Sequence, residues 1–300
     1  MSEILVQNLE KSYGDISALK DISFHVDKSE IFGVIGPDGA GKTSLFRILV
    51  SLLLPDMGSV SLAGHDVVKD YKKIRSIVGY MPGRFSLYQD MSVEENLHFY
   101  ATVFGTSIKE NYDLIRDIYI QIEPFKNRLA GKLSGGMKQK LALSCALIHK
   151  PRILVLDEPT TGVDAVSRVE FWDLLHKISK EGITIIVSTP YMDEAARCHR
   201  VALMQKGKFL GIDKPSDIHI GFKKLLYELL PGNGAFQLLK EIRREKWCEN
   251  AWLFGQSVHL TVNDAESEIE FLNFAKSQHI MHRKIVAGIE DTFMELMKNQ

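Results

Sequence analysis

Short apolar runs alternate with longer helical stretches over residues 1–215, which is the pattern of an α/β domain. Turn-forming residues bound most of the apolar runs, so we interpret these runs as strands. The predicted strands are Ile4–Val6, Ile22–Val26, Ile31–Ile35, Ser59–Leu62, Ile77–Tyr80, Ile153–Leu156, Ile183–Ser188, Val201–Gln205 and Lys208–Ile212.

The helical stretches carry recognisable start signals. Ser92 and Glu95 form a capping box, and Ser134 is a suitable N-cap. Two helices in a row after Ser92 interrupt the alternation with strands, which predicts an inserted helical subdomain at about residues 84–150. The predicted helices are Leu45–Leu54, Asn96–Phe104, Lys109–Ile122, the segment between Ser134 and Pro151, and Ala165–Lys180.

The pattern changes near Pro215, and we place a domain boundary there, with residues 216–300 as a small α+β domain. This part has no concentration of catalytic residue types. His279 and His282 flank a predicted strand, and we interpret them as surface residues rather than ligands. The predicted elements are strands Leu225–Leu230, Trp252–Phe254, Val258–Val262 and Ile280–Val286, and helices Phe236–Lys246, Ala265–Ala275 and Glu290–Lys298.

The loop between the strand Ile31–Ile35 and the helix that follows it carries the candidate chemistry. Its three glycines let backbone N–H groups converge on phosphate oxygens at the positive end of the helix. Lys42 supplies charge for terminal phosphates, and the hydroxyl of Thr43 is placed to ligate Mg²⁺. A glycine-rich turn before an ordinary helix is the alternative. The predicted phosphate-binding loop comprises Gly36, Pro37, Asp38, Gly39, Ala40, Gly41, Lys42, Thr43 and Ser44.

Three further residues are candidates for the same site. Tyr13, in the predicted turn between the first two strands, can stack on a nucleobase or pack on the sheet, and both interpretations stay open. Asp157 and Glu158 follow a predicted buried strand, where adjacent carboxylates are costly unless each has a task. Asp157 can hold Mg²⁺ through water and Glu158 can polarise an attacking water, whereas a solvated strand end is the alternative.

A second candidate anion site precedes the helix that begins after Ser134. Gly135 and Gly136 leave the N–H groups of the first turn without side chains, at the positive helix end. An ordinary capped helix explains an isolated Ser-Gly-Gly equally well.

The composition narrows the class of partner. A net charge of -1 gives no bulk attraction to nucleic acid, and 45% hydrophobic residues suffice for a full core. The three cysteines lack metal-ligand spacing, which favours reduced thiols. The N-terminus lacks signal-peptide features, and the longest apolar stretch, Ile48–Leu54, is far below the about 20 residues that cross a bilayer. We therefore expect any membrane role to require docking on other subunits.

Four motifs stand in one order: Gly36–Thr43, Ser134–Gly136, Leu156–Pro159 and Gly162–Asp164. In this arrangement the chain resembles the ATP-binding subunit of ABC transporters over about residues 3–215. In that family they are the Walker A, signature, Walker B and D-loop motifs, and Tyr13 falls at the adenine-stacking aromatic. The resemblance implies a P-loop NTPase ABC cassette, a mixed sheet core with an inserted helical signature subdomain.

The resemblance also implies ATP and Mg²⁺ as cofactors, Glu158 as the catalytic carboxylate, Thr43 and Asp157 as metal ligands, and Asp164 among the nucleotide-binding residues. The family works as a head-to-tail sandwich, in which one signature caps ATP on the other cassette. The signature residues offered to the partner's ATP are Leu133, Ser134, Gly135, Gly136 and Met137.

Within the family, Leu133–Leu141 and Ile289–Leu296 are similar to ATPase subunits of ABC-2 type multidrug exporters. Gly36–Gly39 and Gly79–Pro82 are similar to the first cassette of two-cassette members. This implies polytopic ABC-2 type membrane subunits and a second cassette, from the same or a different chain, as partners. It also implies a peripheral position at the cytoplasmic face of the inner membrane, and a dimer-stabilising or regulatory role for residues 216–300.

Two positions depart from the family. Gly83 stands where the family has a glutamine that contacts Mg²⁺ and the attacking water, and Pro190 stands where it has a histidine that holds the γ-phosphate. Neither residue has a side-chain group for these contacts. Because Asp157 and Glu158 remain, we expect ATP binding with weak hydrolysis.

Two other functions stay open. A non-transport ABC protein of translation or DNA repair is disfavoured, because the chain lacks a basic linker and a long coiled-coil insertion. A regulatory nucleotide sensor would have no membrane partner. Phe85, Leu87 and Tyr88 are the candidate docking residues for such a partner, although a core-facing loop explains them nearly as well.

Overall fold

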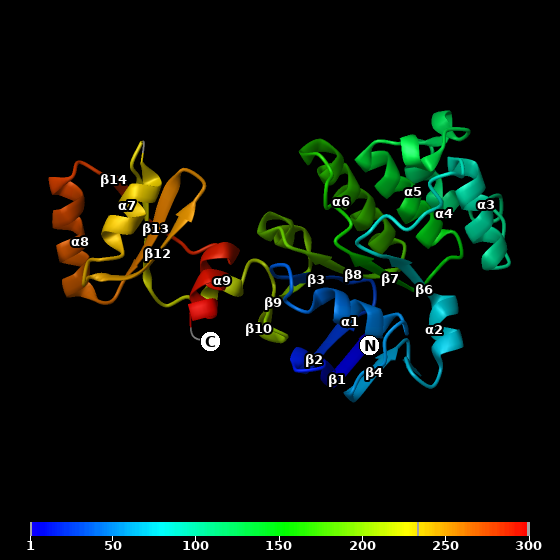
Figure 1. The fold of residues 1–300 in the computed structure, drawn as a ribbon, viewed down its shortest axis with the longest axis horizontal. Helices are drawn as coiled ribbons and strands as arrows, with labels where there is room; N and C mark the ends of the chain where they lie inside the picture. The colour runs from blue at the N-terminus through cyan, green and yellow to red at the C-terminus, as the bar shows by residue number, and fades with distance from the viewer. Residues whose placement is uncertain (1, 233, 299–300) are drawn as a thin grey trace. The chain divides into compact units, whose positions relative to one another are not determined.

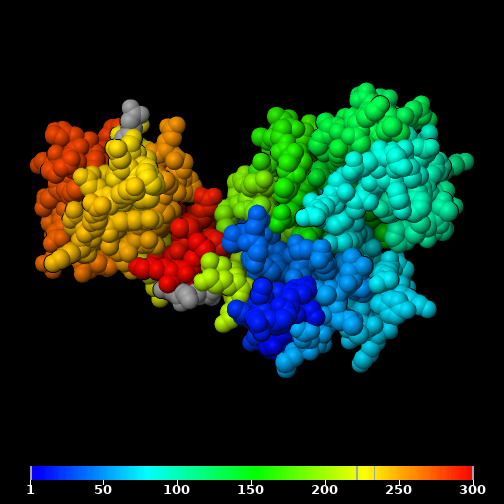
Figure 2. Space-filling model, in the orientation of Figure 1, coloured from blue at the N-terminus to red at the C-terminus, as the bar shows by residue number. Residues whose placement is uncertain are grey.

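The computed structural model describes residues 2–232 and 234–298, and the chain divides into two compact units, residues 1–215 and 216–300 (Figure 1, Figure 2). In the described residues, no helix has both the length and the apolar content that crossing a bilayer requires.

Two sheets build the first unit. The antiparallel sheet has the order β2-β1-β4-β5, and the second sheet has the order β10-β9-β3-β8-β7-β6. Figure 1 shows helix α1, Lys42–Leu49, between them, and their facing apolar side chains form one core with it. The strands are β1 (Ser2–Tyr13), β2 (Ile16–Asp27), β3 (Ile31–Ile35), β4 (Met57–Leu62), β5 (His65–Asp66), β6 (Val78–Met81), β7 (Ile153–Asp157), β8 (Thr184–Thr189), β9 (Arg200–Gln205) and β10 (Lys208–Asp213).

All strands of the second sheet except β10 run parallel, so their carboxyl ends meet at one edge. Ser188 of β8 pairs with Asp157 of β7, and Thr189 pairs with Ile35 of β3. The register therefore brings the residues that follow four separate strands to one place.

Helices α3, α4 and α6 pack around α5, whereas α2 contacts β5 and β6. The capping box at the start of α3 is confirmed, because Glu95 N donates to Ser92 Oγ and Ser92 N donates to the Glu95 carboxylate. The N-cap role of Ser134 is confirmed as well. The helices are α2 (Tyr71–Ile77), α3 (Val93–Val103), α4 (Tyr112–Tyr119), α5 (Gly135–Leu147) and α6 (Ala165–Lys180).

Three local predictions are wrong. The helix predicted at Leu45–Leu54 is α1, which ends at Leu49 because Ser51 takes a φ of +57°. The first two strands are much longer than predicted, because backbone pairing continues through polar residues, and Tyr13 ends β1 instead of lying in the turn. His282 lies within β14 and does not flank it.

The second unit has the order β-α-β-β-α-β, with the sheet order β12-β13-β11-β14, which is a ferredoxin-like arrangement. Side chains of α7 and α8 form a core with one face of this antiparallel sheet. The elements are β11 (Leu225–Leu230), α7 (Ala235–Ile242), β12 (Cys248–Phe254), β13 (Ser257–Val262), α8 (Ala265–Ser277), β14 (Met281–Ile285) and a final helix, α9 (Ile289–Lys298).

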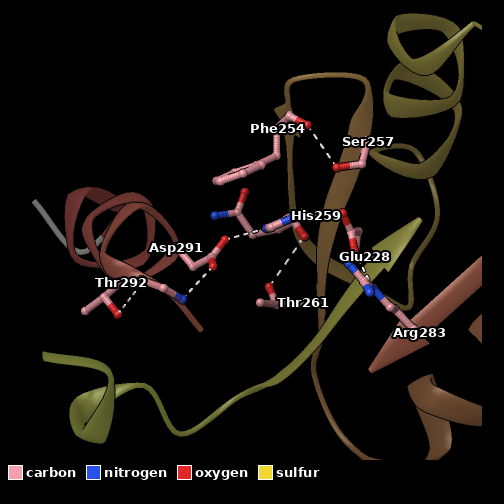
Figure 3. Close-up of polar contacts among 10 residues, drawn as sticks. Glu228, Phe254, Ser257, His259, Thr261, Arg283, Asp291 and Thr292 are labelled. Carbon is pink, nitrogen blue, oxygen red and sulfur yellow. Dashed lines mark hydrogen bonds and ion pairs between the residues drawn. The ribbon is translucent and has the colours of Figure 1, made fainter. Parts of the chain in front are cut away.

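A buried hydrogen-bonded pair, His259 and Asp291, joins α9 to β13 (Figure 3). His259 Nδ1 lies 2.6 Å from Asp291 Oδ1, and the other oxygen of Asp291 accepts a hydrogen bond from Gly288 N at 2.8 Å. The ring of His259 also stacks on Phe254, with 4.3 Å between the ring centres. Removal of Asp291 would leave the imidazole buried without its partner, so the pair holds α9 on the sheet.

We expect Asp291→Ala to raise amide exchange in α9 by roughly 10²-fold, because breaking a buried pair costs about 3 kcal/mol. Hydrogen–deuterium exchange with mass spectrometry measures this directly. Arg283→Gln is the control, since it removes the exposed partner of Glu228 in the same unit and should change exchange in α9 by less than about fivefold. Equal exchange in both variants would mean that the pair does not hold α9.

Candidate functional site

The loop from Gly36 to Gly41 joins β3 to α1, as the sequence predicts. Gly41 takes a φ of +113°, and a Cβ atom there would lie 2.4 Å from the carbonyl oxygen of Ala18. A side chain is therefore excluded on steric as well as conformational grounds. This close approach sets the path of the loop into the first turn of α1.

Lys42 is the first residue of α1, and its side chain turns back onto this loop, so that the residue is only 3% exposed. Its ammonium group donates to the carbonyl oxygens of Gly36 at 2.7 Å and Pro37 at 3.0 Å, and lies 3.0 Å from Glu158 Oε1. These three partners match the three donors of an ammonium group. The ammonium group thus lies against the loop backbone, where phosphate oxygens could replace its two neutral carbonyl partners.

Asp157 and Glu158 reach the site from the end of β7. Asp157 is 2% exposed, and its Oδ1 accepts a hydrogen bond from Ser188 Oγ at 2.7 Å. Glu158 takes a φ of +49°, unusual for a residue with a side chain, and its N–H donates to the backbone oxygen and the hydroxyl of Ser188. The two carboxylates therefore have different partners. Asp157 accepts a hydrogen bond from Ser188 of β8, and Glu158 pairs with Lys42 at the loop.

Sequence reasoning missed Ser188. Its hydroxyl bridges the Asp157 side chain and the Glu158 backbone, so it orients both carboxylates. The available signal is a hydroxyl residue at the end of an otherwise apolar strand, next to Thr189 and Pro190.

Gly83 and Pro190 lie on either side of Asp157. A Cβ atom on Gly83 would lie 3.8 Å from Asp157 Oδ2 and 3.1 Å from the Asp157 carbonyl oxygen. Pro190 comes two residues after Ser188, the strand partner of Asp157. A longer polar side chain at position 83 would thus start beside the carboxylate, whereas the present residues offer no polar group there.

Tyr13 and Thr43 border the loop. The hydroxyl of Tyr13 lies 3.3 Å from Ser44 Oγ, and the residue is 46% exposed. The end of β1 therefore presents an open aromatic surface next to the loop. The hydroxyl of Thr43 has no recorded hydrogen bond to any residue that the structure describes, so it is available to a metal ion.

The residues around Ser134 form a second surface. Ser134 Oγ accepts a hydrogen bond from Met137 N at 3.4 Å, and Asp164 Oδ1 accepts one from Ser167 N at 2.9 Å. Hydrogen bonds from the backbone of Ser167 lower the pKa of Asp164. A Cβ atom on Gly136 would lie 2.8 Å from Ser167 Oγ, so this glycine also lets α5 approach α6 closely.

Ser134, Gly135 and Asp164 are exposed, whereas Leu133 is buried. Within the described chain, no recorded hydrogen bond or ion pair joins this surface to the loop Gly36–Ser44.

Comparison with known proteins points to one family. The model of the family described as "ABC transporter" matches residues 19–161. The probable multidrug ABC transporter ATP-binding protein YbhF of Escherichia coli is 35% identical over 98% of this chain and 52% of its own length. The Nod factor export ATP-binding protein I of Burkholderia thailandensis is 34% identical over 97% and 95%. The chain thus spans about half of the first relative and nearly all of the second.

Solved structures agree with this result. The ATP-binding subunit of an ABC transporter superposes with a TM-score of 0.67 at 25% identity, over 74% of this chain and 93% of its own. The cassette MJ0796, solved as a dimer in a post-hydrolysis state with ADP and Pi, gives a TM-score of 0.64 at 25% identity, over 70% and 98%.

We expect Gly41→Ala to weaken MgATP binding at least about tenfold, because the added methyl group must displace the backbone of Ala18 and the loop with it. Titration with a fluorescent ATP analogue measures the dissociation constant. Gly39→Ala is the matched control: its φ of +77° is also positive, but no atom lies within 4 Å of the added carbon. If both variants bind like the parent, the close approach at Gly41 does not shape the site.

Proposed function

This chain belongs to the ABC transporter ATP-binding proteins, and on that premise we propose that it is the MgATP-binding subunit of an ABC-2 type export system. The predicted fold, a P-loop NTPase ABC cassette with a mixed sheet, is confirmed by the superposed structures. The observation that carries the proposal is the burial of Lys42 against the Gly36–Ser44 loop, where its ammonium group lies 3.0 Å from the Glu158 carboxylate, which follows β7. The export role is supported by the names of the two relatives.

The residues at the site fit ATP and Mg²⁺. In our proposal Lys42 exchanges its carbonyl partners for phosphate oxygens, and the exposed ring of Tyr13 lies against the base. Thr43 and Asp157 would hold the metal ion, which supplies charge neutralisation at the terminal phosphates. Once Lys42 binds phosphate oxygens and no longer pairs with Glu158, the Glu158 carboxylate would polarise the attacking water.

We further propose that hydrolysis at this site is weak. Asp157 has a hydroxyl partner in Ser188, but neither Gly83 nor Pro190 adds a polar side chain next to it. One missing transition-state contact typically lowers turnover by about 10²–10³. Because the family resemblance assigns both positions to the same γ-phosphate site, their effects need not multiply.

We expect the double substitution Gly83→Gln/Pro190→His to raise steady-state ATP turnover by about 10²-fold, since it supplies both missing polar groups. The measurement is phosphate release from purified protein at saturating MgATP. Lys42→Ala is the negative control for contaminating ATPases, because it removes the charge at the centre of the loop. Brisk turnover in the parent, with no gain in the double variant, would contradict weak hydrolysis.

An apolar hollow in the first unit supports a membrane partner. Its volume is about 460 Å³, and β6, α3 and α5 contribute to its lining. Phe85 and Leu87 line it, but Tyr88 does not and instead packs edge-on against Phe99. We propose that an apolar helix of a polytopic ABC-2 type subunit binds here, with this chain peripheral at the cytoplasmic face of the inner membrane.

We expect Val103→Glu to abolish co-purification with the membrane subunits and to leave ATP affinity within about twofold of the parent. Val103 is exposed and lines the hollow, so a carboxylate there opposes an apolar partner. Ile120→Glu, at an exposed site of the same helical region outside the hollow, is the control. Retention of the partner by Val103→Glu would place the docking surface elsewhere.

A second cassette, from the same or a different chain, completes the proposal. Ser134 and Asp164 are exposed, and Gly135 packs near the backbone of Gly162, so these residues form one outward surface. We propose that the segment Leu133–Met137 presents its exposed residues Ser134 and Gly135, together with Asp164, to the ATP of that partner, while Leu133 and Gly136 are buried behind them. Residues 216–300 would stabilise or regulate the dimer. The alternative is a nucleotide sensor, favoured by Gly83 and Pro190, and the absence of any membrane partner would select it.

A further inference from the structure

A buried ion pair connects α6 to the segment that follows β8. Glu194 is 2% exposed, and neither of its carboxylate oxygens makes a hydrogen bond to a residue that the structure describes. Its charge partner is Arg168, whose Nε lies 3.8 Å from Glu194 Oε1 and likewise makes no hydrogen bond there. The pair is therefore held by charge and packing alone.

Arg168 makes two more contacts with the same segment. Its guanidinium group lies over the ring of Tyr191, 4.5 Å from the ring centre, and its Nη1 lies 3.7 Å from Asp193 Oδ2. Tyr191 in turn donates its N–H to Thr189 Oγ1 at 3.0 Å. One side chain of α6 thus touches three residues that follow β8.

A backbone hydrogen bond connects Arg168 to Asp164. At the end of β8, Thr189 connects Tyr191 to the loop Gly36–Ser44. Arg168 N donates to the Asp164 oxygen at 2.9 Å, within the first turn of α6. At the end of β8, Gly36 N donates a hydrogen bond to the backbone oxygen of Thr189 at 3.3 Å. Arg168 is therefore the side chain that spans between the Asp164 turn and the strand end beside the loop.

The contact between Arg168 and Glu194 contributes little to the free energy of folding. A buried carboxylate without hydrogen bonds bears a desolvation penalty that a single cation at 3.8 Å offsets only in part, and apolar residues of similar size would pack at least as well. A contact without directional hydrogen bonds can be shifted at lower cost than a bidentate one. With three contacts from one side chain, the two segments can instead move together while the hydrogen-bond geometry stays unconstrained.

We propose that Arg168 is a positioning residue that couples the Asp164 turn to the segment Thr189–Glu194. Nucleotide in the Gly36–Ser44 loop acts on this segment through Thr189, and Arg168 passes the shift to Asp164, the part offered to a partner cassette. The coupling is reciprocal, so a partner at Asp164 also changes nucleotide affinity. This inference rests on the proposed ATP-binding function.

The test uses the full chain and hydrogen–deuterium exchange with and without MgATP. In the parent, MgATP should slow exchange in three segments: the loop, residues 189–197 and residues 162–168. In Arg168→Gln/Glu194→Gln, which removes both charges together, we expect ATP affinity within about twofold, and the protection of residues 162–168 reduced at least about fivefold. If the pair had only a structural role, its removal would lower the free energy of unfolding but would reduce MgATP-induced protection equally in all three segments.

Two further variants complete the design. Arg168→Lys keeps the positive charge but not the planar group that lies on Tyr191, and we expect it to lose the protection of residues 162–168 as well. Arg197→Gln breaks the exposed pair with Asp173 between the same two elements and should behave like the parent.

The outcomes separate the two proposals. No MgATP binding by the parent would overturn the proposed function, and this inference with it. Binding without protection of residues 162–168 in the parent, or equal protection in the double variant and the parent, would overturn the role of Arg168 alone.

Discussion

The site depends on the parallel pairing of β3, β8, β7 and β6. In this register the carboxyl ends of four strands meet, so residues far apart in the chain share one edge of the sheet. Asp157 and Ser188 are direct strand partners, and the hydroxyl of Ser188 contacts both the Asp157 side chain and the Glu158 backbone. A one-residue slip between β7 and β8 would turn these side chains to opposite faces and separate the two groups.

Burial of Lys42 is the electrostatic consequence of this arrangement. An ammonium group at 3% exposure requires partners, and it finds two carbonyl groups of its own loop and the carboxylate of Glu158. The ion pair keeps the loop closed around a positive charge while Glu158 remains within reach of whatever binds there. In our proposal, nucleotide binding and the position of Glu158 are linked through the side chain of Lys42.

In the second unit, the buried polar pair has a structural role. Its ferredoxin-like sheet is covered by α7 and α8 on one face, and α9 is fastened to β13 through His259 and Asp291. His259 and Asp291 hold a helix in place in this unit, whereas Asp157, Glu158 and Ser188 of the first unit lie at the loop that we propose binds phosphate. The similarity to a Nod factor export protein covers 97% of this chain, so it extends over both units.

The sequence by itself determined the features that depend on neighbouring residues: the Gly36–Ser44 loop between strand and helix, the caps at Ser92 and Ser134, and the α/β class. Caps and periodicity act over one or two helical turns, so a single segment contains the signal. The end of β1 escaped prediction because its backbone pairing with β2 and β4 sets it, and the end of α1 escaped prediction because Ser51 takes a positive φ there. Only the tertiary structure decided that Ser188 orients two carboxylates and that Arg168 reaches Glu194, because these contacts join residues from separate elements, and nothing in either segment specifies its partner.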